Sequence, residues 1–184
     1  MALQGGFEEH IRHLKSLETE TFEIRKKADL NRPMDGLIIP GGESTTMGKL
    51  LKDFAMYDEL KIRIKQGLPT FGTCAGMILL AKQLYDSDVV HFGEMDIVVK
   101  RNAYGRQLGS FFMHAEFKGI GEIPMTFIRA PYVEKIGENV ELLSVVNGKM
   151  VAVRQKNMLA TAFHPELTGN NRVHQFFIDT IVKK

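Results

Sequence analysis

The sequence holds a single cysteine, Cys74, and its positive and negative charges nearly cancel. One thiol cannot form an intramolecular disulfide, so the fold has to be stabilised by its hydrophobic core. A chain of 184 residues is long enough for this, because a domain of that size buries roughly two thirds of the surface that its unfolded chain exposes. The net charge of +2 does not give the basic surface that nucleic acid requires, so we expect no nucleic-acid partner.

Long apolar runs are also absent. The longest, such as GMILLA at 76–81, are far shorter than the ~20 residues needed to span a bilayer. The first 14 residues contain neither the basic nor the apolar segment of a signal peptide. We therefore expect a cytoplasmic protein with no membrane partner. Because no repeat, low-complexity tract or linker interrupts the chain, residues 1–184 are expected to form one domain.

The first half of the chain alternates between helical and strand patterns. Apolar residues recur at helical spacing in the helical segments, and short apolar runs bounded by Pro and Gly indicate buried strands. The predicted elements are a helix at 7–18, a strand at 34–40, one or two helices at 45–66, a strand at 68–72 and a helix at 75–84. This alternation favours a parallel sheet covered by helices on both faces.

Strand patterns dominate the second half. We expect strands at 95–100, 109–117 and 125–130, and further strands within 140–163. Asn147-Gly148 lies between VELLSVV and KMVAVR, which is a strong signal for a β-hairpin. The sheet is therefore expected to end in antiparallel strands, and residues 169–182 to form a closing helix that buries Val173, Phe176, Phe177 and Ile181.

The start of the sequence has an unusual pattern. Met1-Ala2-Leu3 comes directly before Gln4-Gly5-Gly6 and the first predicted helix, so only the end of a first strand is present. We expect the central part of the sheet to be incomplete beside this segment, with one edge of the core poorly covered.

The cysteine lies in Gly72-Thr73-Cys74-Ala75-Gly76, between a predicted strand and a predicted helix. This pattern is typical of a nucleophile elbow, in which a tight strand-to-helix turn exposes the nucleophile and flanking glycines prevent clashes. A helix N-terminus favours thiolate over thiol, and the Ala75 amide would point at an oxyanion beside the sulfur. The alternative is that Cys74 is a small buried apolar residue, as isolated cysteines usually are.

A cysteine nucleophile needs a proton shuttle, and His164 in LATAFHPEL is the best candidate. In an extended chain its side chain projects to the same side as that of Glu166, two residues later. The carboxylate can then orient the imidazole, as the acidic member of a catalytic triad does. The alternative is a plain His-Pro loop with a solvated Glu. The other histidines have no comparable acidic partner in the sequence, and we expect structural or solvated roles for His10, His13, His91, His114 and His174.

Further motifs make the sequence resemble a known family. GTCAG and AFHPEL resemble the class I (triad) glutamine amidotransferases. Four more motifs resemble the glutaminase subunit of the bacterial, plant and protozoan type of pyridoxal 5′-phosphate synthase: LQGGFEEHI at 3–11, DGLIIPGGESTTM at 35–47, RNAYGRQ at 101–107 and FIRAP at 127–131. The resemblance covers nearly the whole chain. It implies a three-layer α/β fold of the class I glutamine amidotransferase-like (flavodoxin-like) type. In this fold helices cover both faces of a mixed sheet, which is mostly parallel and has antiparallel strands in the C-terminal half.

The resemblance also implies roles for individual residues. Cys74 would attack the carboxamide of glutamine, His164 would be the general acid and base, and Glu166 would orient it. Gly42 and Ala75 would supply the backbone donors for the oxyanion. The remaining residues that match substrate-binding or partner-coupled positions are Glu43, Ser44, Arg101, Ile128, Arg129 and, next to the shortened start, Gln4. Arginine suits such a role because its guanidinium can hold the substrate α-carboxylate in a bidentate manner.

The function implied is hydrolysis of L-glutamine to L-glutamate and ammonia through a cysteine thioester, with no cofactor and no metal. The ammonia would pass to a separate synthase subunit, a TIM-barrel protein in a large hetero-oligomer that makes pyridoxal 5′-phosphate. Two alternatives remain open. The chain could be a cysteine hydrolase or peptidase of a related α/β fold, or a catalytically idle regulatory subunit of a synthase.

Overall fold

A computed structural model describes residues 1–101 and 109–183 of the protein, and its helices and strands follow the predicted order. The helical elements are α1 (Phe7–Ser16), η1 (Lys27–Asn31), α2 (Ser44–Asp53), α3 (Tyr57–Lys65), α4 (Ala75–Leu80), η2 (Pro165–Leu167), α5 (Arg172–Phe177) and a final π-helical turn, η3 (Ile178–Val182). The strands are β1 (Leu37–Ile39), β2 (Thr70–Thr73), β3 (Ala81–Leu84), β4 (Met95–Lys100), β5 (Ser110–Phe117), β6 (Gly121–Ile128), β7 (Tyr132–Ile136), β8 (Glu141–Val146), β9 (Lys149–Gln155) and β10 (Met158–Thr161).

The described strands form one large sheet and one separate hairpin. The large sheet has the order β1-β2-β10-β9-β7-β4-β3, with β8 paired to β9, and the hairpin consists of β5 and β6. Strand β2 pairs in parallel with β1 and with β10, while β9 runs antiparallel to β10, β7 and β8. Strands β3 and β4 also pair in parallel. The antiparallel pairs involve strands of the C-terminal half, as predicted, although β10 of that half pairs in parallel with β2.

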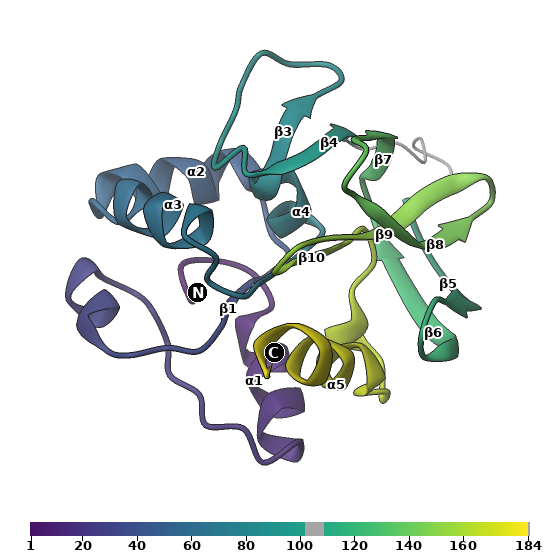
Figure 1. Cartoon of the computed structure of the whole chain (residues 1–184), viewed down its shortest axis with the longest axis horizontal. Coiled ribbons are helices and arrows are strands. Elements are labelled where there is room, and N and C mark those ends of the chain that lie inside the picture. The colour runs from purple at the N-terminus through teal and green to yellow at the C-terminus, as the bar shows by residue number, and fades with distance from the viewer. Residues whose placement is uncertain (102–108, 184) are drawn as a thin grey trace.

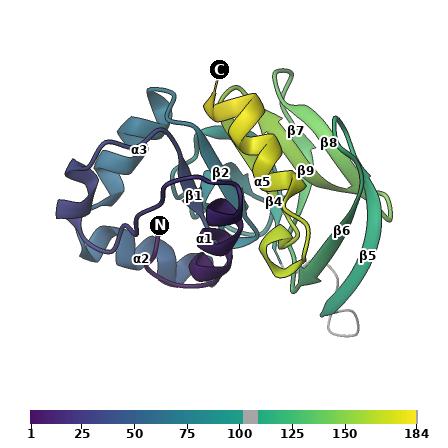
Figure 2. The same ribbon diagram turned by 90° about the horizontal axis from the view of Figure 1, so that it is seen from below.

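Helices cover both faces of the parallel strands. In Figure 1, α1 and α5 lie on one side of β1, β2 and β10, and α2, α3 and α4 lie on the other. Figure 2 shows the same pairing of α1 with α5 from below. Successive residues of β2 face opposite sides of the sheet. The ring of Phe71 lies 5.6 Å from that of Phe177 in α5. Gly72 faces α4, because a Cβ added to it would lie 2.6 Å from the Gly76 carbonyl carbon.

The observed elements differ from the predicted ones at three places. The helix predicted at 75–84 ends at Leu80, and Ala81–Leu84 forms β3, which pairs with β4 and buries Ala81 and Leu84. Strand β7 was not predicted, although it joins β4 to β9. The closing helix begins at Arg172 rather than at 169. A short apolar run fits both a helix pattern and a strand pattern, so whether it becomes a helix or a strand depends on the neighbouring strands with which it can pair in the fold.

The hairpin signal at Asn147-Gly148 is confirmed. These residues join β8 to β9 and have φ values of 50° and 73°, the left-handed values that a tight hairpin turn requires. No helix in residues 1–101 or 109–183 is long and apolar enough to cross a membrane.

The start of the chain lies beside β1, at one end of the strand order. Residues 1–6 form no strand, but the Met1 nitrogen donates to the Ile38 carbonyl at 2.8 Å and the Ala2 amide donates to the Ile24 carbonyl at 2.9 Å. A cavity of about 680 Å³ opens here, lined by apolar side chains that include Phe7, Ile24 and Leu37. The cavity lies at the edge of the core that the sequence predicts to be poorly covered.

Candidate active site

Cys74 lies at the corner between β2 and α4, as the elbow pattern predicts. Its backbone has φ 49° and ψ −100°, a conformation that costs a non-glycine residue of order 1–3 kcal/mol. The Cys74 amide donates to the Thr161 carbonyl of β10 at 2.8 Å, which ties the corner to the neighbouring strand. Ala75 begins α4, so its amide lies directly beside the sulfur among the helix N–H groups that have no partner within the helix.

The glycines on either side of the elbow are required by close backbone approach. A Cβ on Gly76 would lie 2.2 Å from the Ile39 carbonyl oxygen, and a Cβ on Gly72 would lie 2.6 Å from the Gly76 carbonyl carbon. Neither glycine has a positive φ, because Cys74 itself adopts the left-handed conformation. The glycines therefore permit the dense packing of the corner rather than its backbone turn.

His164 and Glu166 follow β10 and come together as the sequence predicts. His164 Nδ1 lies 2.7 Å from Glu166 Oε1, and both side chains are largely buried. The His164 amide also donates to the Thr126 carbonyl of β6 at 2.8 Å, while Pro165 begins the short turn η2 that carries Glu166 back toward the imidazole. The carboxylate thereby fixes the orientation of the ring.

The charge state of His164 depends on its two neighbours. Burial lowers the pKa of His164, but hydrogen bonds to the side chains of Cys74 and Glu166 outweigh that effect and raise the pKa to about 10. The imidazole therefore holds a proton at neutral pH. A protonated imidazole beside the sulfur can deliver a proton to a leaving group there.

The glycine turn after β1 lies directly over this pair. A Cβ on Gly41 would lie 2.3 Å from His164 Cε1 and 3.4 Å from Cys74 Cβ. Gly5, with φ 89°, packs against the same turn, where a Cβ would overlap the Gly41 carbonyl oxygen. Gln4 Oε1 accepts a hydrogen bond from the Glu43 amide at 2.9 Å, so Gln4 does contact the loop that contains Gly42.

Glu43 and Ser44 lie at the start of α2. The Glu43 carboxylate caps α2 by accepting from the Thr45 and Thr46 amides at 3.1 and 2.6 Å. Burial raises its pKa, but these hydrogen bonds more than compensate, so the pKa of Glu43 falls below its ordinary value. Ser44 is the first residue of α2 and is buried. The Glu43 cap thus fixes the end of the Gly41-Gly42 turn at the start of α2.

Of the other predicted substrate contacts, Ile128 is the last residue of β6 and Arg129 follows it. The His164 backbone amide donates to the carbonyl of Thr126, two residues before the end of β6, and Arg129 is exposed directly after that strand with φ 43°. Arg101 is close enough to His91 to contribute to lowering its pKa, after the larger effects of burial and Lys52. The rest of the RNAYGRQ motif, residues 102–107, lies outside the described residues.

The burial of His10 fits the structural role expected for it, but the expectation that it has no acidic partner was wrong. His10 is only 2% exposed, and its Nε2 lies 3.5 Å from Glu166 Oε2, so it does have an acidic neighbour. The sequence contained a signal for burial, because His10 is three residues after Phe7 and four before Leu14 on one face of α1. The contact with Glu166 had no signal, since it joins segments 156 residues apart. Within the described residues, no three His, Cys, Asp or Glu side chains are grouped so that they could hold a metal ion.

Comparisons with known proteins agree with this architecture. A model of the SNO glutamine amidotransferase family matches residues 1–183. The chain is 54% identical over 187 residues to "Pyridoxal 5′-phosphate synthase subunit PdxT" of Streptococcus pneumoniae serotype 2 (strain D39 / NCTC 7466), covering 100% of this chain and 97% of the relative. It is 53% identical over 182 residues to the protein of the same name from Haemophilus influenzae (strain PittEE), covering 97% and 95%.

A solved structure described as "Crystal structure of glutamine amidotransferase" superposes on this chain with a TM-score of 0.93 at 43% identity, covering 100% of this chain and 97% of that one. The α/β fold class predicted from the sequence is therefore confirmed.

Proposed function

Because this chain belongs to the SNO glutamine amidotransferase family, we propose that it hydrolyses L-glutamine to L-glutamate and ammonia and supplies the ammonia to a separate synthase subunit. The observation that carries the proposal is the pair of His164 and Glu166, 2.7 Å apart, together with the Cys74 side chain, which contributes to raising the pKa of the His164 imidazole. An orienting carboxylate, a proton shuttle and a nucleophile then follow in sequence, as acyl transfer requires.

The first step is attack on the side-chain carboxamide of glutamine. The Cys74 sulfur, whose proton has passed to His164, forms a bond to the carboxamide carbon, and the carbonyl electron pair moves onto oxygen. The backbone amides of Ala75 and Gly42 support the resulting oxyanion. Such donors are worth ~10²–10³ in rate each, because they are already oriented when the charge develops.

The second step separates the products. His164 protonates the departing nitrogen, which leaves as ammonia, and a γ-glutamyl thioester remains on Cys74. The imidazole, now neutral, takes a proton from water as the water attacks the thioester, and glutamate leaves with the sulfur restored. Glu166 stabilises the imidazolium in both halves of the cycle.

Specificity for a free amino acid requires groups that recognise its charged end. We assign this role to Arg129 with Ile128 at the end of β6, together with Arg101 and the Gly42-Glu43-Ser44 turn. Arg129 is suited to an α-carboxylate because it is exposed directly after β6.

The ammonia needs an acceptor protein. The curated relatives are named as a subunit of pyridoxal 5′-phosphate synthase, which supports a synthase partner for this chain. We propose that the partner is a TIM-barrel subunit in a large hetero-oligomer, and that it docks near α1 and Gln4. The hydrogen bond from the Glu43 amide to Gln4 gives docking a direct route to the glycine turn.

The test measures ammonia release from L-glutamine with and without the synthase subunit. We expect release that rises when the subunit is added and is abolished in Cys74→Ala, and we expect a glutamine-analogue electrophile to label Cys74. Parallel incubation with casein tests for a peptidase. Cleavage of casein without ammonia release, or an unlabelled Cys74 in the complete complex, would reject the proposal.

A further inference from the structure

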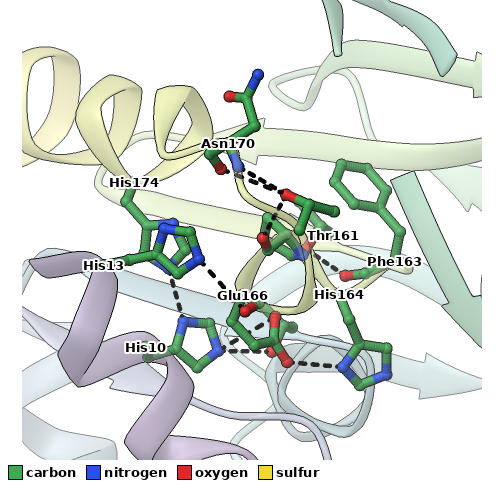
Figure 3. A network of polar contacts seen from close by, with 11 residues as sticks. His10, His13, Thr161, Phe163, His164, Glu166, Asn170 and His174 are labelled. Atoms are coloured by element: carbon green, nitrogen blue, oxygen red, sulfur yellow. Dashed lines mark hydrogen bonds and ion pairs between the residues drawn. The ribbon is translucent and has the colours of Figure 1, made fainter. Parts of the chain in front are cut away.

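A cluster of buried histidines lies behind the proposed triad, and the mechanism above does not use it. His10 comes from α1 and His174 from α5, and their side chains are 2% and 0% exposed. Figure 3 shows both rings on the side of Glu166 that faces away from His164. Glu166 itself is 4% exposed, and an imidazole lies within 3.5 Å of each of its carboxylate oxygens.

The contacts form a continuous chain through the carboxylate. His174 Nε2 lies 2.8 Å from His10 Nδ1, and His10 Nε2 lies 3.2 Å from Thr73 Oγ1 and 3.5 Å from Glu166 Oε2. Glu166 Oε1 lies 2.7 Å from His164 Nδ1. Glu166 Oε2 is buried and makes no hydrogen bond within the described residues, and the His10 Nε2 that faces it lies 3.5 Å away.

Both rings behind Glu166 are neutral at pH 7. Burial, with smaller effects from His174, the amino terminus, His164 and His13, holds the pKa of His10 well below its ordinary value. Burial, followed by the effect of His13, lowers the pKa of His174 to about 3. Each ring therefore carries a single N–H, and the close contact between the two rings needs one donor and one acceptor.

One arrangement of protons suits all the contacts. If His174 Nε2–H donates to His10 Nδ1, the proton of His10 is on Nε2 and faces Thr73 Oγ1 and Glu166 Oε2. The reverse arrangement would direct a lone pair of His10 at the carboxylate. It would also leave a buried N–H on His174 Nδ1, which has no hydrogen-bond partner among the residues that the structure describes. A buried donor without a partner and a lone pair facing a carboxylate are both unfavourable.

We propose that His10, held in its Nε2–H tautomer by His174, is a positioning residue that fixes Glu166 and, through it, His164. An N–H group then faces each oxygen of Glu166, which disfavours rotation of the carboxylate away from His164. The Nδ1–H of His164 stays on Glu166, and its Nε2 stays directed at Cys74. This inference rests on the proposed glutaminase function, and His10 itself does not contact the substrate.

The test compares two variants of His10 in the full chain with the synthase subunit. In His10→Gln the side-chain amide can still donate from the position of Nε2, whereas in His10→Phe a ring of similar size fills the site without a donor. We expect His10→Phe to lower kcat about tenfold with KM little changed, the loss expected for one hydrogen bond to a charged group. His10→Gln should restore kcat to within about threefold of the wild type, by the same reasoning.

His13→Phe is the matched control. His13 lies one turn along α1 and stacks on His174 at 4.6 Å, but it reaches only the backbone oxygen of Glu166, at 3.3 Å. Its kcat should stay within about twofold of the wild type, because the carboxylate keeps its partner. Unchanged kcat in His10→Phe, or equal losses in His10→Gln and His10→Phe with equally lowered Tm, would show that His10 only fills space and would overturn the inference.

A second measurement does not depend on any variant folding. Nitrogen-15 spectra of the histidine-labelled wild-type protein should show His10 with its proton on Nε2 and an unprotonated Nδ1 that accepts a hydrogen bond. A His10 protonated on Nδ1 would overturn the inference while leaving glutamine hydrolysis intact. A wild-type complex that releases no ammonia would instead reject the proposed function and the inference together.

Discussion

At the scale of single residues, the site depends on glycines at positions where a side chain would clash with neighbouring atoms. Gly41 lies over His164 and Cys74, Gly5 packs against Gly41, and Gly76 packs against Ile39. Each of these contacts joins segments that are far apart in the sequence. The glycines therefore let the turn after β1, the elbow and the start of the chain approach one another closely enough to enclose the sulfur and the imidazole.

Gly41→Ala should disable the site without unfolding the protein. The new Cβ would lie 2.3 Å from His164 Cε1, so the imidazole has to move, and a displacement of about 1 Å typically costs ~10² in rate. We expect kcat for glutamine hydrolysis to fall by roughly that factor. Gly169→Ala is the control, because no atom lies within 4 Å of its Cβ position and its φ is not positive. A Gly41→Ala enzyme with wild-type kcat would contradict the observed packing.

The raised pKa of His164 predicts a loss of stability at high pH. Its folded-state value of about 10 lies above the 6.5 of an ordinary imidazole, so the folded protein keeps a proton that the unfolded chain releases. The contribution is complete below pH 6.5 and disappears as the pH rises through about 10. Cys74→Ala removes one group that raises this pKa, so we expect the stability of that variant to start falling at a lower pH than that of the wild type.

Urea unfolding measures the free energy of unfolding of the wild type and of Cys74→Ala between pH 6 and pH 10. This is roughly the interval over which the folded and unfolded states of the wild type differ in bound protons. Direct titration of His164 by NMR in both proteins provides an independent check. An imidazole of the wild-type protein that titrates near its ordinary value would contradict the ion-pair interpretation.

At the scale of elements, histidines of α1 and α5 meet where the two helices approach each other. His10 and His13 from α1 meet His174 from α5, with ring centroids 5.1 and 4.6 Å from it. Phe71 of β2 closes the cluster from the sheet. Imidazoles fill the space as aromatic rings do, but they can also bind protons, so this interface is sensitive to acid.

His174 should contribute to acid unfolding. Its folded-state pKa of about 3 lies below the ordinary 6.5, so between these values the unfolded chain binds a proton that the folded protein does not. Its contribution therefore lowers stability progressively as the pH falls from 6.5 toward 3. Replacing it with Gln or with Phe should reduce the slope of unfolding free energy against pH by up to about 1.4 kcal/mol per pH unit, which corresponds to one proton. An unchanged slope in both variants would assign the acid sensitivity to other groups.

At the scale of the whole molecule, the start of the chain and the active site are directly connected. Gln4 precedes α1 and holds the Glu43 amide, while Glu43 caps α2 and carries the glycine turn. These contacts join the segment before α1 to the turn over Cys74, so the proposed docking of a partner near α1 would act on that turn.

Gln4→Ala should weaken activation by the synthase subunit. Loss of the hydrogen bond to Glu43 frees the turn, so we expect the synthase-stimulated rate of ammonia release to fall about tenfold. Gln66→Ala, at the end of α3, is the control for a generic loss of glutamine. Equal stimulation of the Gln4 variant and the wild type would exclude this route of coupling.

The family resemblance, the fold class and the proposed roles of Cys74, His164 and Glu166 were available from the sequence. Local patterns carry that information: glycines around a lone cysteine, a His-x-Glu after a strand, and apolar periods that distinguish strand from helix. The first two of these are confirmed as structure, since the elbow forms and the His164–Glu166 pair closes at 2.7 Å. Their catalytic roles stay predictions for the experiments above.

Only the tertiary structure decided that Ala81–Leu84 is a strand, that Gly41 covers the imidazole and that His10 lies behind Glu166. Each of these features depends on which distant segment becomes a neighbour, and no local pattern encodes that choice. The chain thus specifies by itself which residues can perform the chemistry. Packing of β1, β10, α1 and α5 against β2 decides which groups surround those residues, because close contacts and burial arise only when the elements come together.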